Sequence, residues 1–196
     1  MYIDKVKIVK PYRSFKGNEV FECRPLNIIV GDQGCGKSTL LQGLQRHENF
    51  IDVELSARGH LGVDTYYFDT ESMNPRLKDP ISYSNIDGTN KGIGVGTAVA
   101  SRFKSHGEIL VCCTVEAMRK GKSSIVFVDE PESGLSLKNQ YLYLKEMEKA
   151  IKRECQLFIA THSLVLIEAM DEVLSLEHGK WMKSKDFIES NKSELS

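Results

Sequence analysis

The chain has 196 residues, of which 41% are hydrophobic and 27% are charged. This length and composition fit one compact globular domain and exclude a chain that is disordered throughout. The 26 Lys and Arg residues nearly balance the 27 Asp and Glu residues, which leaves a formal net charge of -1. That balance excludes a protein that coats nucleic acid by bulk charge, while leaving room for a local basic patch.

The expected location follows from hydropathy and cysteine usage. No stretch of the sequence approaches the roughly 18 apolar residues that a membrane span needs, and the first residues do not form a signal peptide. The five cysteines are odd in number and show no C-x-x-C spacing. We therefore expect a cytoplasmic protein with reduced thiols and no membrane span.

The first part of the chain is predicted to form β structure. Charged and apolar residues alternate over residues 2–9, which predicts an exposed or edge strand, and a second strand is expected over 19–23. Leu26–Val30 is almost continuously apolar, as is typical of a parallel strand buried on both faces. A glycine-rich loop follows this strand, and leucines at helical spacing follow the loop.

The remaining elements alternate between buried strands and helices. Strands are expected over 63–68, 124–128 and 156–160, helices over 108–118, 137–151 and 164–170, and a hairpin over 173–182. The sequence thus predicts a single α/β domain over residues 1–183. Residues 184–196 read as a polar C-terminal tail that frays.

A phosphate-binding pattern begins at residue 31. The order Gly-Asp-Gln-Gly-Cys-Gly-Lys-Ser matches G-x-x-x-x-G-K-[ST], and it stands between a buried strand and a helix, where this pattern functions. In such a loop, backbone N–H groups surround phosphate oxygens, Lys37 reaches the β and γ phosphates, and the Ser38 hydroxyl ligates Mg2+. The residues expected to bind nucleotide are Gly31, Asp32, Gln33, Gly34, Cys35, Gly36, Lys37, Ser38 and Thr39.

Two carboxylates follow the apolar run that ends at Val128. A parallel strand brings its last residue to the carboxyl edge of the sheet, so Asp129 is expected to help hold Mg2+. Glu130 comes next and can polarise an attacking water, which favours hydrolysis over transfer to a small acceptor. An acidic turn without function is the alternative interpretation.

The order and spacing of these motifs resemble the ATPase head of the ABC superfamily, in the branch that includes SMC, RecF and OLD-like proteins. The resemblance rests on Asp-Glu-Pro at 129–131, on Ser-Gly-Leu-Ser at 133–136 in the position of the D-loop, and on Thr-His-Ser at 161–163. It implies a P-loop NTPase with a mostly parallel central sheet and an N-terminal antiparallel β element. It also implies ATP with Mg2+, catalytic roles for Lys37, Glu130 and His162, and a contact of His162 with the γ phosphate.

Three further assignments come from the same resemblance. Arg13, in a Tyr-Arg-Ser-Phe stretch, is placed near the adenine, unless this stretch is a simple turn with Phe15 in the core. Glu71 replaces the usual Q-loop glutamine as a contact to metal or water, unless it belongs to a solvated acidic loop. The signature motif that acts on the neighbouring subunit's ATP falls on Ser105, His106, Gly107 and Glu108, unless these residues begin an ordinary capped helix.

The sequence shows neither the long coiled coil of SMC-type heads nor an attached nuclease segment. We therefore expect a compact ATP-hydrolysing switch that dimerises head to tail around two ATP molecules. It would act on DNA or with a protein partner such as a nuclease, in DNA metabolism, repair, or phage or anti-phage functions. A transporter's nucleotide-binding subunit, a P-loop phosphotransferase and a non-hydrolysing binding module are the alternatives.

Overall fold

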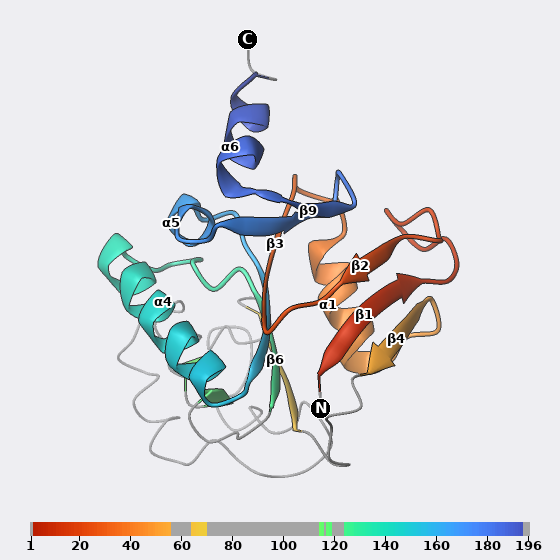
Figure 1. The fold of residues 1–196 in the computed structure, drawn as a ribbon, viewed down its shortest axis with the longest axis horizontal. Helices are drawn as coiled ribbons and strands as arrows, with labels where there is room; N and C mark the ends of the chain where they lie inside the picture. The colour runs from red at the N-terminus through yellow and green to blue at the C-terminus, as the bar shows by residue number, and fades with distance from the viewer. Residues whose placement is uncertain (1, 56–63, 70–113, 116, 119–123, 194–196) are drawn as a thin grey trace.

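The computed structural model describes residues 2–55, 64–69, 114–115, 117–118 and 124–193. Within these residues the strands form a six-stranded sheet, ordered β5-β6-β7-β3-β8-β9, and a three-stranded sheet, ordered β2-β1-β4 (Figure 1). The strands are β1 (Ile3–Ile8), β2 (Val20–Glu22), β3 (Leu26–Val30), β4 (Ile51–Leu55), β5 (Thr65–Asp69), β6 (Ile125–Asp129), β7 (Gln156–Ala160), β8 (Glu172–Ser175) and β9 (Lys180–Lys183). The helices are α1 (Lys37–Arg46), α4 (Leu137–Lys152), α5 (Leu164–Glu168) and α6 (Ser184–Ser193).

The larger sheet is mostly parallel, and it confirms the predicted fold class. β3 pairs in parallel with β7 on one side and β8 on the other, and β6 pairs in parallel with β5 and β7. Among the described strands of this sheet, only β9 runs antiparallel to its neighbour. All five residues of both β6 and β7 are buried. Strands covered on both faces lose the polar alternation of an exposed sheet, which is why they read as continuous apolar runs.

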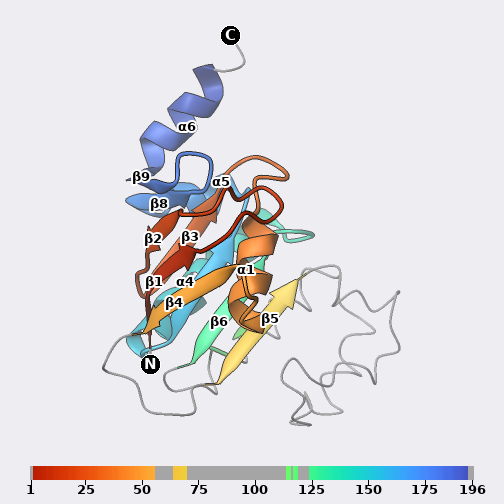
Figure 2. The ribbon, with the colours of Figure 1, turned by 90° about the vertical axis from the view of Figure 1, so that its right-hand side faces the viewer.

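Each face of this sheet has its own hydrophobic core. Side chains of Ile28, Val126 and Ile159 pack with α4 and α5 on one face. Neighbouring positions on the same strands, such as Ile29 and Phe127, point to the other face and pack with α1 and the N-terminal sheet. The helix α1 therefore lies between the two sheets, beside β4 and β5 (Figure 2).

The N-terminal sheet differs from the prediction in two ways. β1 was expected at an edge, but it is the middle strand, because the unpredicted strand β4 pairs along its other side. The pairing of β1 with β4 also shifts register between Ile3 and Lys5. This bulge lets Ile3 share the buried face with Val6 and Ile8, whereas strict alternation would put Ile3 on the opposite face.

One buried side chain joins the two sheets. Gln156, the first residue of β7, accepts a hydrogen bond from the Ile3 backbone N–H at 2.7 Å. Its Nε2 donates to the backbone oxygens of Ile3 at 2.7 Å and Arg24 at 3.1 Å. A single amide thus satisfies backbone groups of β1 and of the segment before β3, which fixes the N-terminal sheet against the central one.

The C-terminal segment corrects the expected fraying. Residues Ser184–Ser193 form α6, which contacts β8 and β9 and projects above the sheet (Figure 1). Phe187 is only 8% exposed, and Ser184 Oγ donates a hydrogen bond to the Met170 carbonyl at 2.6 Å. The segment was expected to fray because its composition is polar, but the buried side chain of Phe187 anchors α6. The helix predicted over 108–118 lies mostly outside the described residues. Four of its residues are described, and all four are helical: Thr114, Val115, Ala117 and Met118.

No helix among the described parts of the chain is long and apolar enough to cross a membrane.

Replacing Gln156 with Leu tests the link between the sheets. Gln156→Leu removes three hydrogen bonds and leaves buried backbone groups without these partners, so we expect it to lower the free energy of unfolding by about 2 to 4 kcal/mol. Urea unfolding followed by circular dichroism measures this loss. Gln33→Leu, at an exposed glutamine, is the matched control and should change stability by less than about 0.5 kcal/mol. Equal stability of the two variants would contradict the bridging role.

Candidate functional site

The glycine-rich loop stands between β3 and α1, at the carboxyl edge of the central sheet. Gly36 has a φ of 110°, and a Cβ there would overlap Ser14 Oγ. Gly31 has a φ of 143°, and a Cβ there would overlap Cys35 Sγ. Both positions need glycine for backbone conformation as well as for space, and the loop thereby turns tightly enough to present N–H groups to a phosphate.

Lys37 places its charge inside this loop. The residue begins α1 and is 6% exposed. Its Nζ donates to the carbonyl oxygens of Gly31 at 2.8 Å and Asp32 at 2.9 Å, and it lies 3.8 Å from Cys35 Sγ. A largely desolvated ammonium group held by neutral acceptors is well prepared to pair with an entering anion.

Asp129 is the last residue of β6 and has the environment of a metal ligand. It is 8% exposed, and its Oδ1 has no hydrogen-bond partner among the residues described. Burial raises the pKa of this carboxyl group, while a hydrogen bond with Ser38 and the charge of Lys37 act in the opposite direction. A buried carboxylate with an unsatisfied oxygen beside a hydroxyl group fits Mg2+, which prefers hard oxygen ligands. The structure therefore brings the side chains of Ser38 and Asp129 together.

Tyr67 and Gln42 border this acidic group and were missed by the sequence analysis. Gln42 Nε2 donates to Tyr67 Oη at 3.2 Å, and Tyr67 Oη lies 3.5 Å from Asp129 Oδ2. Burial and the nearby Asp129 charge raise the pKa of Tyr67, so its hydroxyl stays protonated and can donate to the carboxylate. Tyr67 lies near Asp129 because β5 pairs with β6 so that Tyr67 is opposite Phe127, two residues before Asp129. This register is not visible in the sequence, so the sequence did not connect Tyr67 with Asp129.

Glu130 and His162 lie next to each other at the ends of adjacent strands. Glu130 follows β6 with a φ of 51°, and its N–H donates to the Ala160 carbonyl at 2.9 Å. His162 follows β7, and its Nε2 is 3.9 Å from Glu130 Oε1. The two side chains are 47% and 44% exposed, respectively. A carboxylate and an imidazole thus stand side by side at an open edge of the site.

The stretch around Arg13 forms a turn with Phe15 in the core, which was one of the two alternatives left by the sequence. Tyr12 and Phe15 form a β-bridge, and Phe15 is buried in the core. Arg13 adopts a φ of 51° at the tip of this turn, and its Nη1 donates to Thr39 Oγ1 at 3.3 Å. Tyr12 stacks on Phe50 with ring centroids 4.2 Å apart. The turn therefore sits against the start of α1, beside the phosphate-binding loop.

Two other carboxylates bind the backbone of the site and were not singled out from the sequence. Glu132 Oε1 accepts a hydrogen bond from the His162 N–H at 2.7 Å. Glu177, in the turn between β8 and β9, accepts one from the Asp32 N–H. Glu132 directly follows the Asp-Glu-Pro motif, which could have drawn attention to it. Glu177 is 145 residues from Asp32, so no local pattern connects them.

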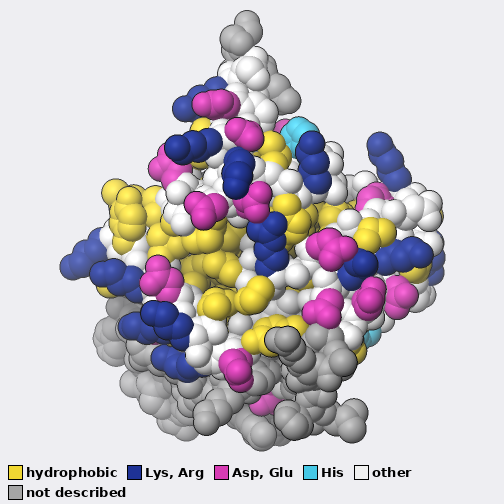
Figure 3. All heavy atoms as spheres, viewed as in Figure 1, with side chains coloured by type: hydrophobic (Ala, Val, Ile, Leu, Met, Phe, Trp, Pro, Cys, Tyr) yellow, Lys and Arg dark blue, Asp and Glu magenta, His cyan; other side chains and the backbone are white. Residues whose placement is uncertain are grey.

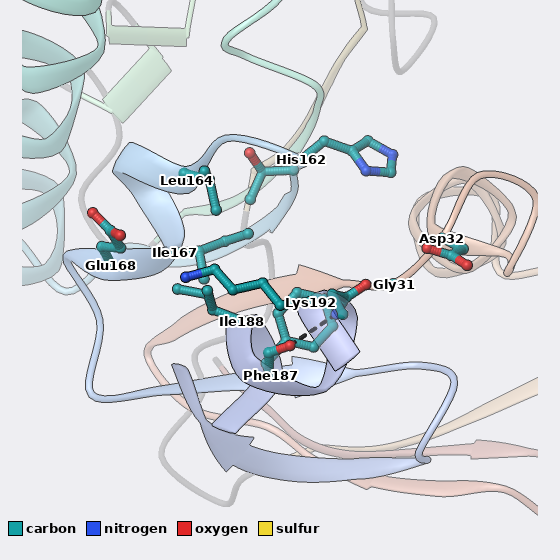
Figure 4. Close-up of a pocket in the computed structure, with 11 residues that line it drawn as sticks. Gly31, Asp32, His162, Leu164, Ile167, Glu168, Phe187, Ile188 and Lys192 are labelled. Carbon is teal, nitrogen blue, oxygen red and sulfur yellow. Dashed lines mark hydrogen bonds between the residues drawn. The ribbon is translucent and has the colours of Figure 1, made fainter. Parts of the chain in front are cut away.

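A cavity of about 310 Å³ opens between the phosphate-binding loop, the loop of His162, and helices α5 and α6 (Figure 4). Asp32 and His162 border it on one side, and Ile167, Phe187 and Lys192 on the other. The helix α6 therefore forms a wall close to the nucleotide motifs. Glu71, Ser105, His106, Gly107 and Glu108 lie outside the described residues, so the structure gives no position for them.

Comparisons with known proteins agree with this geometry. The sequence matches a family described as "AAA domain, putative AbiEii toxin, Type IV TA system" over residues 26–108 and 114–168, which is more than half of the chain. The fold is similar to that of CbiO1 from Clostridium perfringens, part of the ABC transporter complex CbiONQ, with a TM-score of 0.60 and 14% identity over 97% of this chain and 92% of that one. It is also similar to an ATP-binding subunit of an ABC transporter, with a TM-score of 0.56 and 15% identity over 97% and 94% of the two chains.

Replacing Lys37 tests whether the loop binds phosphate through its buried charge. Lys37→Ala removes the only side-chain cation that the described structure places inside the loop, so we expect the affinity for ATP to fall by about 100-fold or more. Isothermal titration calorimetry with Mg-ATP measures this loss. Lys180→Ala, at an exposed lysine on β9, is the control and should bind normally. Unchanged affinity of the Lys37 variant would contradict the assignment.

Proposed function

Because the chain belongs to this AAA-domain family and has the fold of ABC-type ATPases, we propose that it is an ATP-hydrolysing switch. The observation that supports hydrolysis most directly is the grouping of Lys37, Asp129, Glu130 and His162 at one edge of the sheet. ATP with Mg2+ is the proposed substrate, with Ser38 and Asp129 as protein ligands of the metal. Once bound, Mg2+ would neutralise charge on the phosphate oxygens.

The protein groups divide the chemistry among them. Glu130 takes a proton from the water whose oxygen attacks the γ phosphorus, while the bond between the γ phosphorus and the bridging oxygen breaks and ADP leaves. Lys37 neutralises charge on the β and γ phosphates, and the His162 imidazole hydrogen-bonds a γ-phosphate oxygen. Arg13 is proposed to contact the base or ribose, since it lies against Thr39 beside the loop.

The exposure of Glu130 and His162 supports a head-to-tail dimer. Hydrolysis requires a site that excludes bulk water, yet these two side chains are about half exposed in the single chain. A second copy would close the site with its Ser105, His106, Gly107 and Glu108, which would face the γ phosphate. Glu71 would contribute to the metal or water shell.

An exposed apolar surface beside the same loops also favours this assembly. Leu137 and Tyr141 at the start of α4 are 61% and 54% exposed, and Leu164 at the start of α5 is 58% exposed. Figure 3 shows hydrophobic side chains gathered over this end of α4 beside α5. Because Leu137 follows the D-loop and Leu164 follows His162, a subunit docked at the site would also cover this surface.

The biological setting is proposed from the branch that the motifs resemble. A compact RecF-, SMC- or OLD-like head without coiled coil would act in the cytoplasm with a protein partner such as a nuclease, or on DNA, in repair or phage-related functions. The likeness of the fold to transporter subunits favours one second candidate, the nucleotide-binding subunit of a transporter. The ATPase rate with and without DNA, measured at several protein concentrations, separates a head that acts on DNA from a transporter subunit, because only the former predicts stimulation by DNA.

Glu130→Gln tests the hydrolytic mechanism. The amide keeps the size of the side chain but cannot accept the proton, so we expect ATP binding to persist and turnover to fall by about 100-fold or more. Phosphate release under saturating Mg-ATP measures the rate, and calorimetry measures binding. Glu148→Gln, at an exposed position of α4, is the matched control. Normal turnover of the Glu130 variant would remove this residue from the mechanism.

The dimer has its own test in the hydrolysis-deficient background. We expect the chain to be largely monomeric without nucleotide and Glu130→Gln to dimerise with Mg-ATP, because each trapped ATP then bridges two subunits. Adding Ser105→Arg should block dimerisation by placing a bulky side chain where the partner's γ phosphate lies, while the subunit's own loop still binds ATP. Light scattering measures the mass. A dimer that persists in the double variant would show that residues 105–108 are not the signature motif.

A further inference from the structure

The loop that carries His162 is attached to the D-loop segment by side chains rather than by the sheet. The ladder between β6 and β7 ends at the pair Asp129 and Ala160, with one further backbone bond from the Glu130 N–H to Ala160. Beyond that point Glu132 accepts the hydrogen bond of the His162 N–H at 2.7 Å. Beyond the end of the ladder, the Glu132 carboxylate therefore replaces a backbone carbonyl as the acceptor for the next segment of chain.

A second contact ties the other side of the same loop. Ser163 Oγ donates to Gln140 Oε1 at 2.7 Å, and Gln140 Nε2 donates to the Leu135 carbonyl in the D-loop at 3.3 Å. Ser163 Oγ also caps α5 by accepting the Leu166 N–H at 3.3 Å. His162 and Ser163 are therefore held from both sides of the D-loop, by Glu132 directly before it and by Gln140 of α4 after it.

The carboxylates of Glu132 and Glu130 differ in burial and in hydrogen bonding. Oε1 is engaged by the His162 N–H, and Oε2 is buried without a hydrogen-bond partner among the described residues. Glu130 instead leaves its carboxylate about half exposed at the open edge. Glu132 is therefore poorly placed to accept a proton from an attacking water, and well placed to hold backbone through a charge-assisted hydrogen bond.

We propose that Glu132 is a positioning residue that sets the His162 imidazole against the γ phosphate. This proposal rests on the proposed ATPase function. It gives the D-loop a direct route to the catalytic edge, because a shift of residues 132–135 moves the backbone of His162 with it. Displacement of a catalytic group by about 1 Å can cost on the order of 100-fold in rate, so a single backbone hydrogen bond can control turnover.

The contact itself is tested without nucleotide. Glu132→Ala removes the acceptor, whereas Glu132→Gln keeps an oxygen that can accept the same N–H. We expect amide hydrogen exchange of His162, followed by ¹H–¹⁵N NMR, to speed up at least about tenfold in Glu132→Ala and to stay near wild type in Glu132→Gln. Unchanged exchange in Glu132→Ala would overturn the proposal, and this result does not depend on ATP hydrolysis.

Steady-state kinetics then separates positioning from chemistry. We expect Glu132→Ala to lower kcat by about tenfold or more with KM for ATP changed less than about threefold, since Lys37 and its loop still bind the nucleotide. Glu132→Gln should restore kcat to within about threefold, and Glu148→Ala should behave as wild type. A Glu132→Gln variant as slow as Glu132→Ala would overturn the positioning role, because the charge rather than the contact would then matter. A wild-type chain that does not hydrolyse ATP would instead refute the proposed function, and the exchange result would still decide whether Glu132 holds His162.

Discussion

The parallel register of the central strands is the constraint on which the rest of the site depends. Ile29 of β3 pairs with Ala160 of β7, and Ala160 pairs with Asp129 of β6. These residues form one row across the sheet, and each functional loop leaves its strand at or just beyond that row. Slipping one strand by two residues would keep its buried face but would carry its loop about 7 Å along the sheet. The two-sided hydrophobic core therefore specifies the chemistry as well as the stability, because it fixes this register.

Strong local patterns predicted most of this sheet, and contacts distant in sequence accounted for what was missed. β7 begins and ends where its apolar run predicted, since a strand buried on both faces has a distinctive composition. β4 was not predicted because Ile51–Leu55 alternates over only five residues. Without β4, the sequence could not show that β1 is the middle strand of its sheet. Lys37, Asp129 and His162 were predictable from motifs. Glu177 was not, because its partner lies 145 residues away and only the folded sheet brings them together.

The charges at the carboxyl edge of the central sheet favour binding of a cation. Asp129 is buried with an unpartnered oxygen, and the pKa of its carboxyl group is raised because burial opposes ionisation. Glu130 adds a second negative charge that acts in the same direction. Sites of this kind commonly cost stability, which is recovered when a cation and its anionic partner bind. Binding of metal and nucleotide is therefore expected to stiffen the edge of the sheet at which we propose that hydrolysis takes place.

The contacts that join the N-terminal sheet to the rest of the molecule differ in strength. Gln156 ties the beginning of β1 to the central sheet, and Arg13 touches Thr39 at the other end of the N-terminal unit. The first contact is buried and made of three hydrogen bonds, while the second is a single 3.3 Å contact near the surface. Trp181 of β9 adds a third link, because its Nε1 donates a hydrogen bond to the Glu22 carbonyl of β2 at 2.7 Å. The N-terminal sheet is therefore held more firmly along β1 and β2 than at Arg13. A molecule that contacted both Arg13 and Lys37 would strengthen this weaker end, because it would link the N-terminal turn to the loop before α1.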